Sequence, residues 1–334
     1  MLNQAKSTTA SPWLIVAFVA TLWVVTSLAA CSKRGPGENS GENVEQKTFA
    51  SPAAAGTALL EAAKSGDHNA LLAIFGPDGK DVVSSGDPVK DKNTMQRFVD
   101  AYSQMNRWTK TNGGDEILII GADNFPFPIP LHQNASGQWA FNTAAGKDEI
   151  LARRVGDGEL TAIGVLTEIA NAQQEYFSKN HQFAQKFLSD EGQRNGLYWP
   201  VAEGQPPSPL GPLADVAKAL GYSANNKPQP FNGYYYKMLT QQAGKAKGGA
   251  KDYVNDGKMT GGFAVLAWPA TYQDSGVMTF MVGEDGVIYQ KDLGKNTSDA
   301  AAAITAYDPG EGWAVVLNPE PANARVPAKT AMKR

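Results

Sequence analysis

The sequence predicts an α+β protein with two modules, each made of helices packed on a small antiparallel sheet. Residues 261–294 hold three apolar segments separated by turn clusters, a pattern typical of an antiparallel meander. Residues 160–177 repeat apolar side chains at the period of a helix that buries one face. Residues 51–141 run from helical patterns to short strand patterns. A sheet this small needs a cover over its apolar face, so we expect the 160–177 helix to cover the meander.

The composition is that of a globular protein with no strong charge bias. The 334 residues carry a formal net charge of -3, and 42% of them are hydrophobic and 19% charged. A chain of this length can bury two cores of moderate size. Its lysines and arginines are scattered along the chain, so we expect no nucleic-acid partner.

Residues 1–30 have the layout of a secretory signal. Lys6 supplies a positive charge, residues 13–28 are almost all apolar, and small residues precede Cys31. Residues 28–31, with the sequence LAAC, resemble the lipobox of bacterial lipoproteins. That resemblance implies that Cys31 carries acyl chains such as palmitate, becomes the first residue of the mature chain and holds it to the bilayer.

The context of the cysteine bears on where the chain lies. Ser32, in place of an aspartate, implies the periplasmic face of the outer membrane by the sorting habit of the lipoprotein family. A run of about 18 apolar residues is near the lower limit for spanning, so a single transmembrane anchor is the alternative. Cys31 is the only cysteine in the chain, so we expect no disulfide framework.

Two further segments lie outside the predicted modules. Residues 31–50 are rich in Gly, Ser, Asn, Glu and Lys, with few apolar groups to offset the entropy of ordering them. We expect a flexible tether there. Residues 321–334 are rich in Pro, Ala and Lys and are predicted to be a disordered tail.

Residues 51–147 form the first predicted module. Helical spacing of apolar residues comes first, and short β-branched and aromatic segments follow. The proline-rich residues 125–130 are predicted to be an edge strand or a loop, because proline donates no ladder hydrogen bond. This order is similar to that of the cone-shaped folds related to nuclear transport factor two, and the likeness implies a concave pocket. We expect helices at 54–64, 70–75 and 93–105 and strands at 117–120, 129–131 and 139–141.

Residues 148–320 form the second predicted module. A short helix at 147–154 is predicted to end at the Gly-Asp-Gly of residues 156–158, before the long helix at 160–177. Residues 195–212 are predicted to be loop, because prolines interrupt them repeatedly. The other expected elements are a helix at 213–220, a strand at 233–239, a mobile loop at 244–257, the meander, a helix at 300–306 and a strand at 313–317.

Several sequence blocks in these modules are long and specific. They are Ser85-Gly86-Asp87-Pro88, residues 125–131, residues 145–150 with Arg153-Arg154, Gly196-Leu197-Tyr198-Trp199-Pro200, residues 208–212 and residues 261–294. On these blocks the chain resembles the bacterial family catalogued as domain of unknown function 2950. The family is named for lacking a known activity, so the likeness implies an envelope protein and no catalytic residue.

The order of elements in the C-terminal half is similar to the globular heads of type II secretion pseudopilins. In both, a long helix is followed by a loop-rich segment, a small helix and an antiparallel meander, here ending at residues 276–288. In this chain the helix lies mid-chain and lacks the membrane half that drives filament assembly. The likeness therefore concerns the fold and not assembly.

Motifs of familiar catalytic chemistry are missing from the sequence. His68, His132 and His181 lie far apart, and the chain contains no zinc-protease, nucleophile-elbow or phosphate-loop motif. The turn at 283–286 lacks the alternating oxygen ligands and closing glutamate of a calcium loop. We therefore expect no catalytic residue, no metal and no cofactor.

One candidate site is a set of charges where the first module meets the second. We expect an inter-module salt-bridge cluster, because paired arginines lower carboxylate pKa values away from the range useful near neutral pH. A carboxylate pair for acid–base chemistry is the alternative. The set is Asp148, Glu149, Arg153, Arg154 and Glu159.

A second candidate site is aromatic. Rings beside Gly and Pro in loops can stack on sugars or clasp a peptide, and they can also fill a small core. We expect the rings to fill the interior of the second module, with binding as the alternative. The candidate binding residues are Tyr198, Trp199, Trp268 and Tyr272, beside Pro200, Tyr234 and Tyr236.

Together these observations favour a lipid-anchored envelope lipoprotein that acts as a non-enzymatic binding or assembly module. Its expected partners are the bilayer, through Cys31, and an envelope protein or glycan. One alternative is a cell-wall hydrolase that uses Glu149 with Asp157 or Glu159 as its acids. The other is a small-molecule carrier that uses the concavity of the first module.

Overall fold

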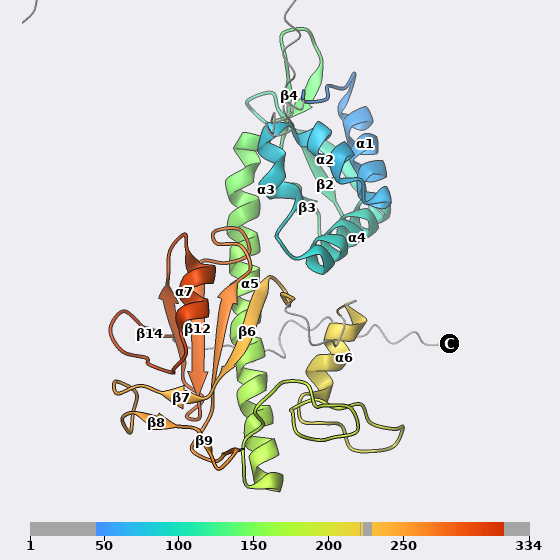
Figure 1. Cartoon of the computed structure of the whole chain (residues 1–334). Coiled ribbons are helices and arrows are strands. Elements are labelled where there is room, and N and C mark those ends of the chain that lie inside the picture. The colour runs from blue at the N-terminus through green and yellow to red at the C-terminus, as the bar shows by residue number, and fades with distance from the viewer. Residues whose placement is uncertain (1–44, 221, 223–228, 317–334) are drawn as a thin grey trace, which may run out of the picture. The chain divides into compact units, whose positions relative to one another are not determined.

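The computed structural model describes residues 45–220, 222 and 229–316 of the chain. They form an α+β fold in two modules, each with helices on a small antiparallel sheet, as the sequence predicts (Figure 1). The predicted signal, Cys31, most of the tether and the predicted tail lie outside these residues. Within the described part of the chain, no helix is both long enough and apolar enough to cross a bilayer.

The N-terminal module begins with helices whose starts are marked in the sequence. The side chains of Ser51, Asp67 and Asp87 each accept a hydrogen bond from a backbone amide in the first turn of the helix that follows. Proline occupies the start of two of these helices, where its missing amide costs nothing. The helices are α1 (Pro52–Ser65), α2 (His68–Phe75), the 3-10 turn η1 (Pro77–Gly79), α3 (Lys80–Val83) and α4 (Pro88–Gln104).

The sheet of this module has the strand order β1-β2-β4-β5, with β3 paired to β2. The sequence did not indicate β1, because its residues NRWTK have no apolar face. The strand expected at 129–131 begins only at Leu131, although Ile129 is fully buried. The strands are β1 (Asn106–Lys110), β2 (Glu116–Ile120), β3 (Phe125–Pro126), β4 (Leu131–Gln133) and β5 (Trp139–Phe141).

The core of the N-terminal module joins the sheet to α1 and α2. Phe75 and Phe141 meet edge to face with ring centroids 5.4 Å apart, and Leu59 and Ile74 pack beside them with 3% and 2% exposure. Burying such side chains contributes about 1.5–3 kcal/mol each. Leu59 and Phe75 of this cluster also line a hollow of the N-terminal module that is described below.

A single helix, α5 (Thr143–Asn180), runs for 38 residues from the N-terminal module into the C-terminal one. The expected break at residues 156–158 is therefore wrong, and the expected boundary at 147/148 falls inside this helix. Glycine in a helix interior costs only about 1 kcal/mol. Tertiary contacts offset that cost here, because a Cβ on Gly158 would meet the carbonyl oxygen of Ser275 well inside van der Waals contact.

The C-terminal module is built on the sheet β14-β13-β12-β11-β6, in which every neighbouring pair is antiparallel. The predicted meander is present as β11 (Ala264–Pro269), β12 (Met278–Gly283) and β13 (Ile288–Asp292). Two small ladders lie in and beside the expected loop at 244–257. The other elements are α6 (Gly211–Ala219), β6 (Tyr234–Leu239), β7 (Gln241–Gln242), β8 (Lys251–Asp252), β9 (Val254–Asn255), β10 (Lys258–Met259), α7 (Thr297–Ala303) and β14 (Ala314–Val315).

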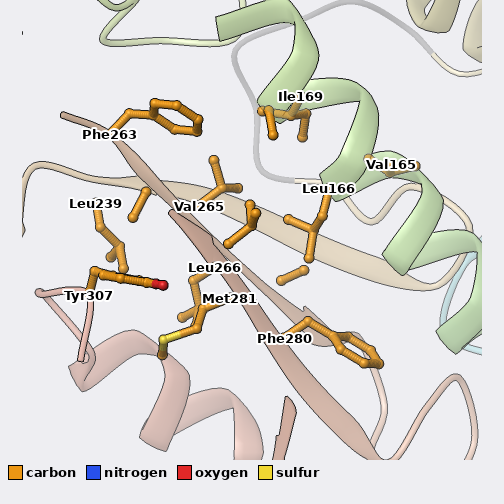
Figure 2. Packing of buried hydrophobic residues seen from close by; sticks show 14 of the residues in the cluster. Val165, Leu166, Ile169, Leu239, Phe263, Val265, Leu266, Phe280, Met281 and Tyr307 are labelled. Carbon is orange, nitrogen blue, oxygen red and sulfur yellow. The ribbon is translucent and has the colours of Figure 1, made fainter. Parts of the chain in front are cut away.

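Helix α5 covers the meander, as the sequence predicts. Leu166 and Ile169 project from α5 onto the sheet, where Val265 and Phe280 lie (Figure 2). Leu166 is fully buried and Ile169 is 2% exposed. Helix α7 also contacts β11, so the sheet is buried by helices from two parts of the chain.

Candidate functional site

The charged set predicted from the sequence lies along α5. The Arg154 guanidinium donates hydrogen bonds to the carbonyl oxygens of Asp81 (2.7 Å), Val82 (2.7 Å) and Ser84 (3.2 Å), and it pairs with the carboxylate of Asp274. Its side chain is only 13% exposed. Arg154 therefore ties the segment before α4 to the loop before β12.

The other members of the set do not converge with Arg154 on one point. Glu159 accepts hydrogen bonds from the backbone amides of Val277 and Met278, each at 3.0 Å, and so holds the start of β12. Glu149 pairs with Arg153 one turn along the helix at 2.6 Å, and both are exposed. The Asp148 side chain is exposed and makes no hydrogen bond or ion pair with any described residue.

The geometry of α5 bears on the proposed acid–base pair. Glu149 and Asp157 are eight residues apart, which is about 12 Å along a helix axis. Glycosidase carboxylates lie roughly 5–9.5 Å apart. Asp157 and Glu159 are two residues apart, so their side chains face different sides of the helix. The helix therefore does not aim these carboxylates at a common point.

Asp274 is the buried acid of this region. Burial raises its pKa above the ordinary aspartate value, while the neighbouring Arg154 guanidinium acts in the opposite direction. Both side chains are nearly enclosed, at 14% and 13% exposure. The pair is suited to joining two segments, since both terminal nitrogens of Arg154 already donate hydrogen bonds.

Two members of the aromatic set meet at a hollow in the C-terminal module. Tyr198 and Trp268 both line a cavity of about 1150 Å³. Trp199 instead packs under the guanidinium of Arg194, at 5.6 Å from the ring centroid, and the Tyr272 hydroxyl donates to Asp292 at 3.1 Å. The structure therefore brings Tyr198 and Trp268 together at the cavity, whereas Trp199 and Tyr272 lie outside its lining.

The expectation that the rings fill the interior is only partly right. Tyr234 is fully buried and its hydroxyl donates to the carbonyl oxygen of Met278 at 2.9 Å. Tyr198, Tyr236 and Trp268 instead pack one side against the core and leave the other side facing the hollow. Loops supply the missing walls, so the sequence pattern of the sheet could not reveal the hollow.

The hollow, named the aromatic hollow below, lies against the outer edge of β6. Its walls come from α5, the loop at 185–190, α6 and β6. Tyr235 stacks on Trp268 with centroids 5.6 Å apart, which gives the rim a flat aromatic face. Further lining rings come from Phe187, Tyr198, Tyr222, Phe231 and Tyr236.

Among the described residues, three of the four charged side chains that line the aromatic hollow already have partners, and the fourth, Lys218, is exposed. Asp190 pairs with Lys186 at 2.8 Å, and the hydrogen bonds from Lys186 and Asn195 lower the pKa of Asp190. Lys237 donates to the carbonyl oxygens of Ala301 (2.6 Å) and Ala302 (3.0 Å) near the end of α7, a position that favours a cation. Burial lowers the pKa of Lys237.

The backbone of β6 is open toward this hollow over a short window. Tyr234 exchanges both of its backbone hydrogen bonds with Phe231, so its amide and carbonyl point away from β11. Because antiparallel strands alternate, the backbone groups of Tyr236 and Met238 point the same way. Farther along, Thr240 accepts from Tyr253. The amides and carbonyls of Tyr236 and Met238 therefore have no backbone partner among the described residues.

A second hollow lies in the N-terminal module, where the fold likeness implied a concave pocket. Its volume is about 550 Å³. The rings of Phe75, Phe98 and Phe127 form its apolar walls, with centroids 5.7 and 6.4 Å apart. Lys90 and Asp157 stand at its polar side, with Nζ and Oδ2 3.0 Å apart. We name it the N-terminal hollow.

The sequence did not point to Lys90. The Asp87-Pro88 start of α4 places Lys90 in the first turn of that helix, and this signal is local. Its partner Asp157 lies far along the chain on α5, and no sequence pattern connects the two. The 9% exposure of the Lys90 side chain becomes clear only in the folded chain.

Asp87, within one of the family-like blocks, joins the two modules. Its side chain is 1% exposed and caps α4 through the amides of Val89 and Lys90. It also accepts from the hydroxyl of Tyr222 at 2.7 Å and from the amide of Gly233 at 2.9 Å. Burial, helped by Asp87, raises the pKa of the Tyr222 phenol. Asp87 in the Ser85-Gly86-Asp87-Pro88 block therefore both starts α4 and connects it to the C-terminal module.

Metal ligands do not cluster in the part of the chain that the structure describes. No three His, Cys, Asp or Glu side chains there could hold an ion together. His132 is exposed beside Asp115, with 2.7 Å between Nδ1 and Oδ1, while His68 and His181 belong to separate helix ends. The two hollows, rather than a cluster of metal ligands, are therefore the candidate binding sites among the described residues.

Comparison with known proteins identifies one family. A model described as "Protein of unknown function (DUF2950)" matches residues 46–316, which is most of the chain and nearly all of its described part. No curated protein and no solved structure matches the chain. The likenesses to pseudopilin heads and to nuclear transport factor two therefore stay predictions from the sequence.

Proposed function

We propose that this chain, which belongs to the DUF2950 family of proteins of unknown function, is a non-enzymatic binding protein of the cell envelope. Its binding site is the aromatic hollow of the C-terminal module, and its ligand is an extended peptide segment. The observation that carries the proposal is the open window on β6, where two residues turn backbone groups that have no backbone partner among the described residues toward a hollow of about 1150 Å³.

An unpaired strand edge is a template for another strand. A peptide laid along Tyr236 and Met238 would gain main-chain hydrogen bonds, as in the domains that bind partners by adding a strand to a sheet. Phe231 closes the window at one end and Tyr253 at the other. The length of the window therefore limits the added strand to a few residues.

The rings around the window suit the side chains of such a peptide. Successive residues of an added strand point to opposite faces of the sheet. On one face they would meet Tyr235 stacked on Trp268, and on the other the ring of Tyr236. The hydroxyl of Tyr236 is buried and has no hydrogen-bond partner among the described residues. A polar ligand group would satisfy it.

Binding accounts for this lining better than carboxylate hydrolysis does. Asp190 is the one carboxylate on the described walls of the aromatic hollow, and Lys186 holds it at 2.8 Å. Hydrolysis of a glycosidic bond uses two carboxylates that flank the bond. The walls supply rings and backbone groups, which orient a ligand without transforming it.

The proposal that the chain lies in the cell envelope rests on the sequence. The lipobox-like LAAC of residues 28–31 supports acylation of Cys31. The low-apolar residues 32–44 support a tether to the outer membrane, whereas Phe49 of the expected tether is buried in the core of the N-terminal module. Cells fed labelled palmitate should yield labelled protein in the membrane fraction, and Cys31→Ala should remove both the label and the membrane association. A Cys31→Ala chain that is still labelled and membrane-bound would show that the predicted lipid anchor at Cys31 is wrong.

The binding proposal is tested with a phage-displayed library of random peptides panned on the purified protein. A selected peptide should slow hydrogen exchange at the amides of Tyr236 and Met238, because both gain a partner. Ala214→Trp places an indole in the α6 wall and should abolish binding. Ala219→Trp, at the exposed end of the same helix and outside the hollow, is the matched control and should bind normally.

Two results would overturn the proposal. One is a selected peptide that protects other amides and still binds Ala214→Trp. The other is a library that yields no binder while cell-wall oligosaccharides bind the wild-type chain and lose binding in Ala214→Trp. The second result would assign the aromatic hollow to glycans.

A further inference from the structure

We propose that the N-terminal hollow binds a single-chain amphiphile with a carboxylate head group. The chain lies among the rings of the hollow and the head group lies at Lys90. This site is separate from the aromatic hollow, and either proposal can fail without the other.

The walls of the N-terminal hollow fit an apolar chain. Its volume of about 550 Å³ falls inside the range of roughly 300–1,000 Å³ that is usual for small-molecule sites. Phe98 and Phe127 face it with ring centroids 5.7 Å apart, and aliphatic side chains fill the spaces between the rings. The aliphatic lining residues are Leu59, Ala63, Leu71, Val82, Val83, Met95, Ala101, Ile120 and Ile150.

A buried ammonium group stands at the polar side of this hollow. The Lys90 side chain is 9% exposed, and its Nζ is fully enclosed. Nζ lies 3.0 Å from Oδ2 of Asp157, yet it donates no hydrogen bond of acceptable geometry to any described residue. An ammonium carries three donors, and donors left unpaired in a buried place are unfavourable. A ligand oxygen would relieve this deficit.

The neighbouring carboxylates leave room for such an oxygen. Asp91 is buried and is committed to Ser85, whose amide and hydroxyl donate to it at 3.0 and 2.5 Å. Asp157 is 58% exposed and can turn to water when a second anion approaches Lys90. The ligand carboxylate would then take its place as the partner of Nζ.

Cations outnumber carboxylates among the described lining side chains, and one cation stands at the rim. The lining residues include four cations, Lys90, Arg97, Arg153 and Arg154, and two carboxylates, Asp91 and Asp157. Two of the cations, Arg153 and Arg154, already pair with Glu149 and Asp274 outside the lining. At the rim, the Arg153 guanidinium lies 4.9 Å from the ring centroid of Phe125, which is 45% exposed. The rim thus offers an apolar ring and a cation side by side, as the entry of an anionic amphiphile requires.

The test uses a palmitic acid analogue that carries a diazirine and an alkyne, added to membranes that contain the full chain. After illumination, mass spectrometry should find the adducts on peptides of α4, β3 and α5 that line the hollow. Peptide mapping keeps these adducts apart from any acyl group on Cys31. Free palmitate should lower the labelling at least tenfold. Methyl palmitate, which has the same chain and no charge, should compete at least tenfold less well.

Variants locate the head group. Lys90→Met keeps an unbranched side chain without charge and should lower the labelling at least tenfold. Lys92→Met, on the exposed side of the same helix, should label like the wild-type chain. Thermal unfolding shows whether Lys90→Met folds, and the competition experiments on the wild-type chain remain decisive if it does not.

Three results would each overturn the proposal. Methyl palmitate that competes as well as palmitate would show that no carboxylate is recognised. Vesicles of an anionic phospholipid that compete where palmitate does not would assign the hollow to a two-chain lipid. Adducts found only outside the lining peptides would show that the hollow takes no acyl chain.

Discussion

The two glycines in the middle of α5 should respond in opposite directions to the same substitution. A Cβ added at Gly156 meets no atom within 4 Å. A Cβ added at Gly158 would overlap the carbonyl oxygen of Ser275 and lie 3.5 Å from Cε2 of Tyr234. The pair separates the intrinsic helix preference of alanine from the packing of α5 against the C-terminal module.

The magnitudes follow from these surroundings. Gly156→Ala should raise the free energy of unfolding by about 0.5–1 kcal/mol, because alanine loses less backbone entropy than glycine. Gly158→Ala gains the same amount and then loses about 1–3 kcal/mol to overpacking against a backbone oxygen that cannot rotate away. The net change at Gly158 should be a loss of up to about 2 kcal/mol.

Thermal unfolding followed by circular dichroism measures both changes. For a folded body of this size, 1 kcal/mol corresponds to a shift of roughly 2–4 °C in Tm. Gly156→Ala should melt above the wild-type protein and Gly158→Ala below it. If Gly158→Ala were as stable as Gly156→Ala, α5 would not touch the Ser275 loop, and the close approach that explains the uninterrupted helix would be refuted.

Three further substitutions test the packing and the junction of the modules. Leu166→Ala removes a fully buried side chain of α5 and should cost about 2–5 kcal/mol in urea unfolding, whereas a cost below 1 kcal/mol would mean that α5 does not cover the meander. Asp87→Asn weakens the bonds to Tyr222 and Gly233 and should cost about 1.5–3 kcal/mol. Tyr222→Phe should cost less in the Asp87→Asn variant than in the wild-type chain, since Asp87→Asn has already weakened the hydrogen bond that Tyr222→Phe removes, and full additivity would contradict that bond.

The sequence predicts those elements whose signals are local. Helices α1, α2 and α4 carry both an apolar period and a capping residue, and β11, β12 and β13 carry apolar segments between turns. The continuity of α5 could not be predicted in this way. Position 158 requires glycine because Ser275, a residue far away in the chain, packs against it. From the sequence alone, a glycine at this position predicts the end of a helix.

The candidate sites show the same division. The sequence identifies Tyr198, in a loop, and Trp268, near the end of β11, because aromatic residues beside proline are recognisable by type. The open edge of β6 depends on which strand ends the sheet, and that is decided by pairing over long distances. The ion pair between Lys90 and Asp157 likewise joins α4 to α5, and the sequence of neither helix indicates that the two side chains meet.

Residue-resolved hydrogen exchange of the free protein tests the central claim most directly. The account predicts slow exchange at the amides of Tyr235 and Lys237, which face β11, and fast exchange at those of Tyr236 and Met238, which face the aromatic hollow. Equally slow exchange at all four amides would show that the edge of β6 is already paired, and the hollow could not accept an added strand.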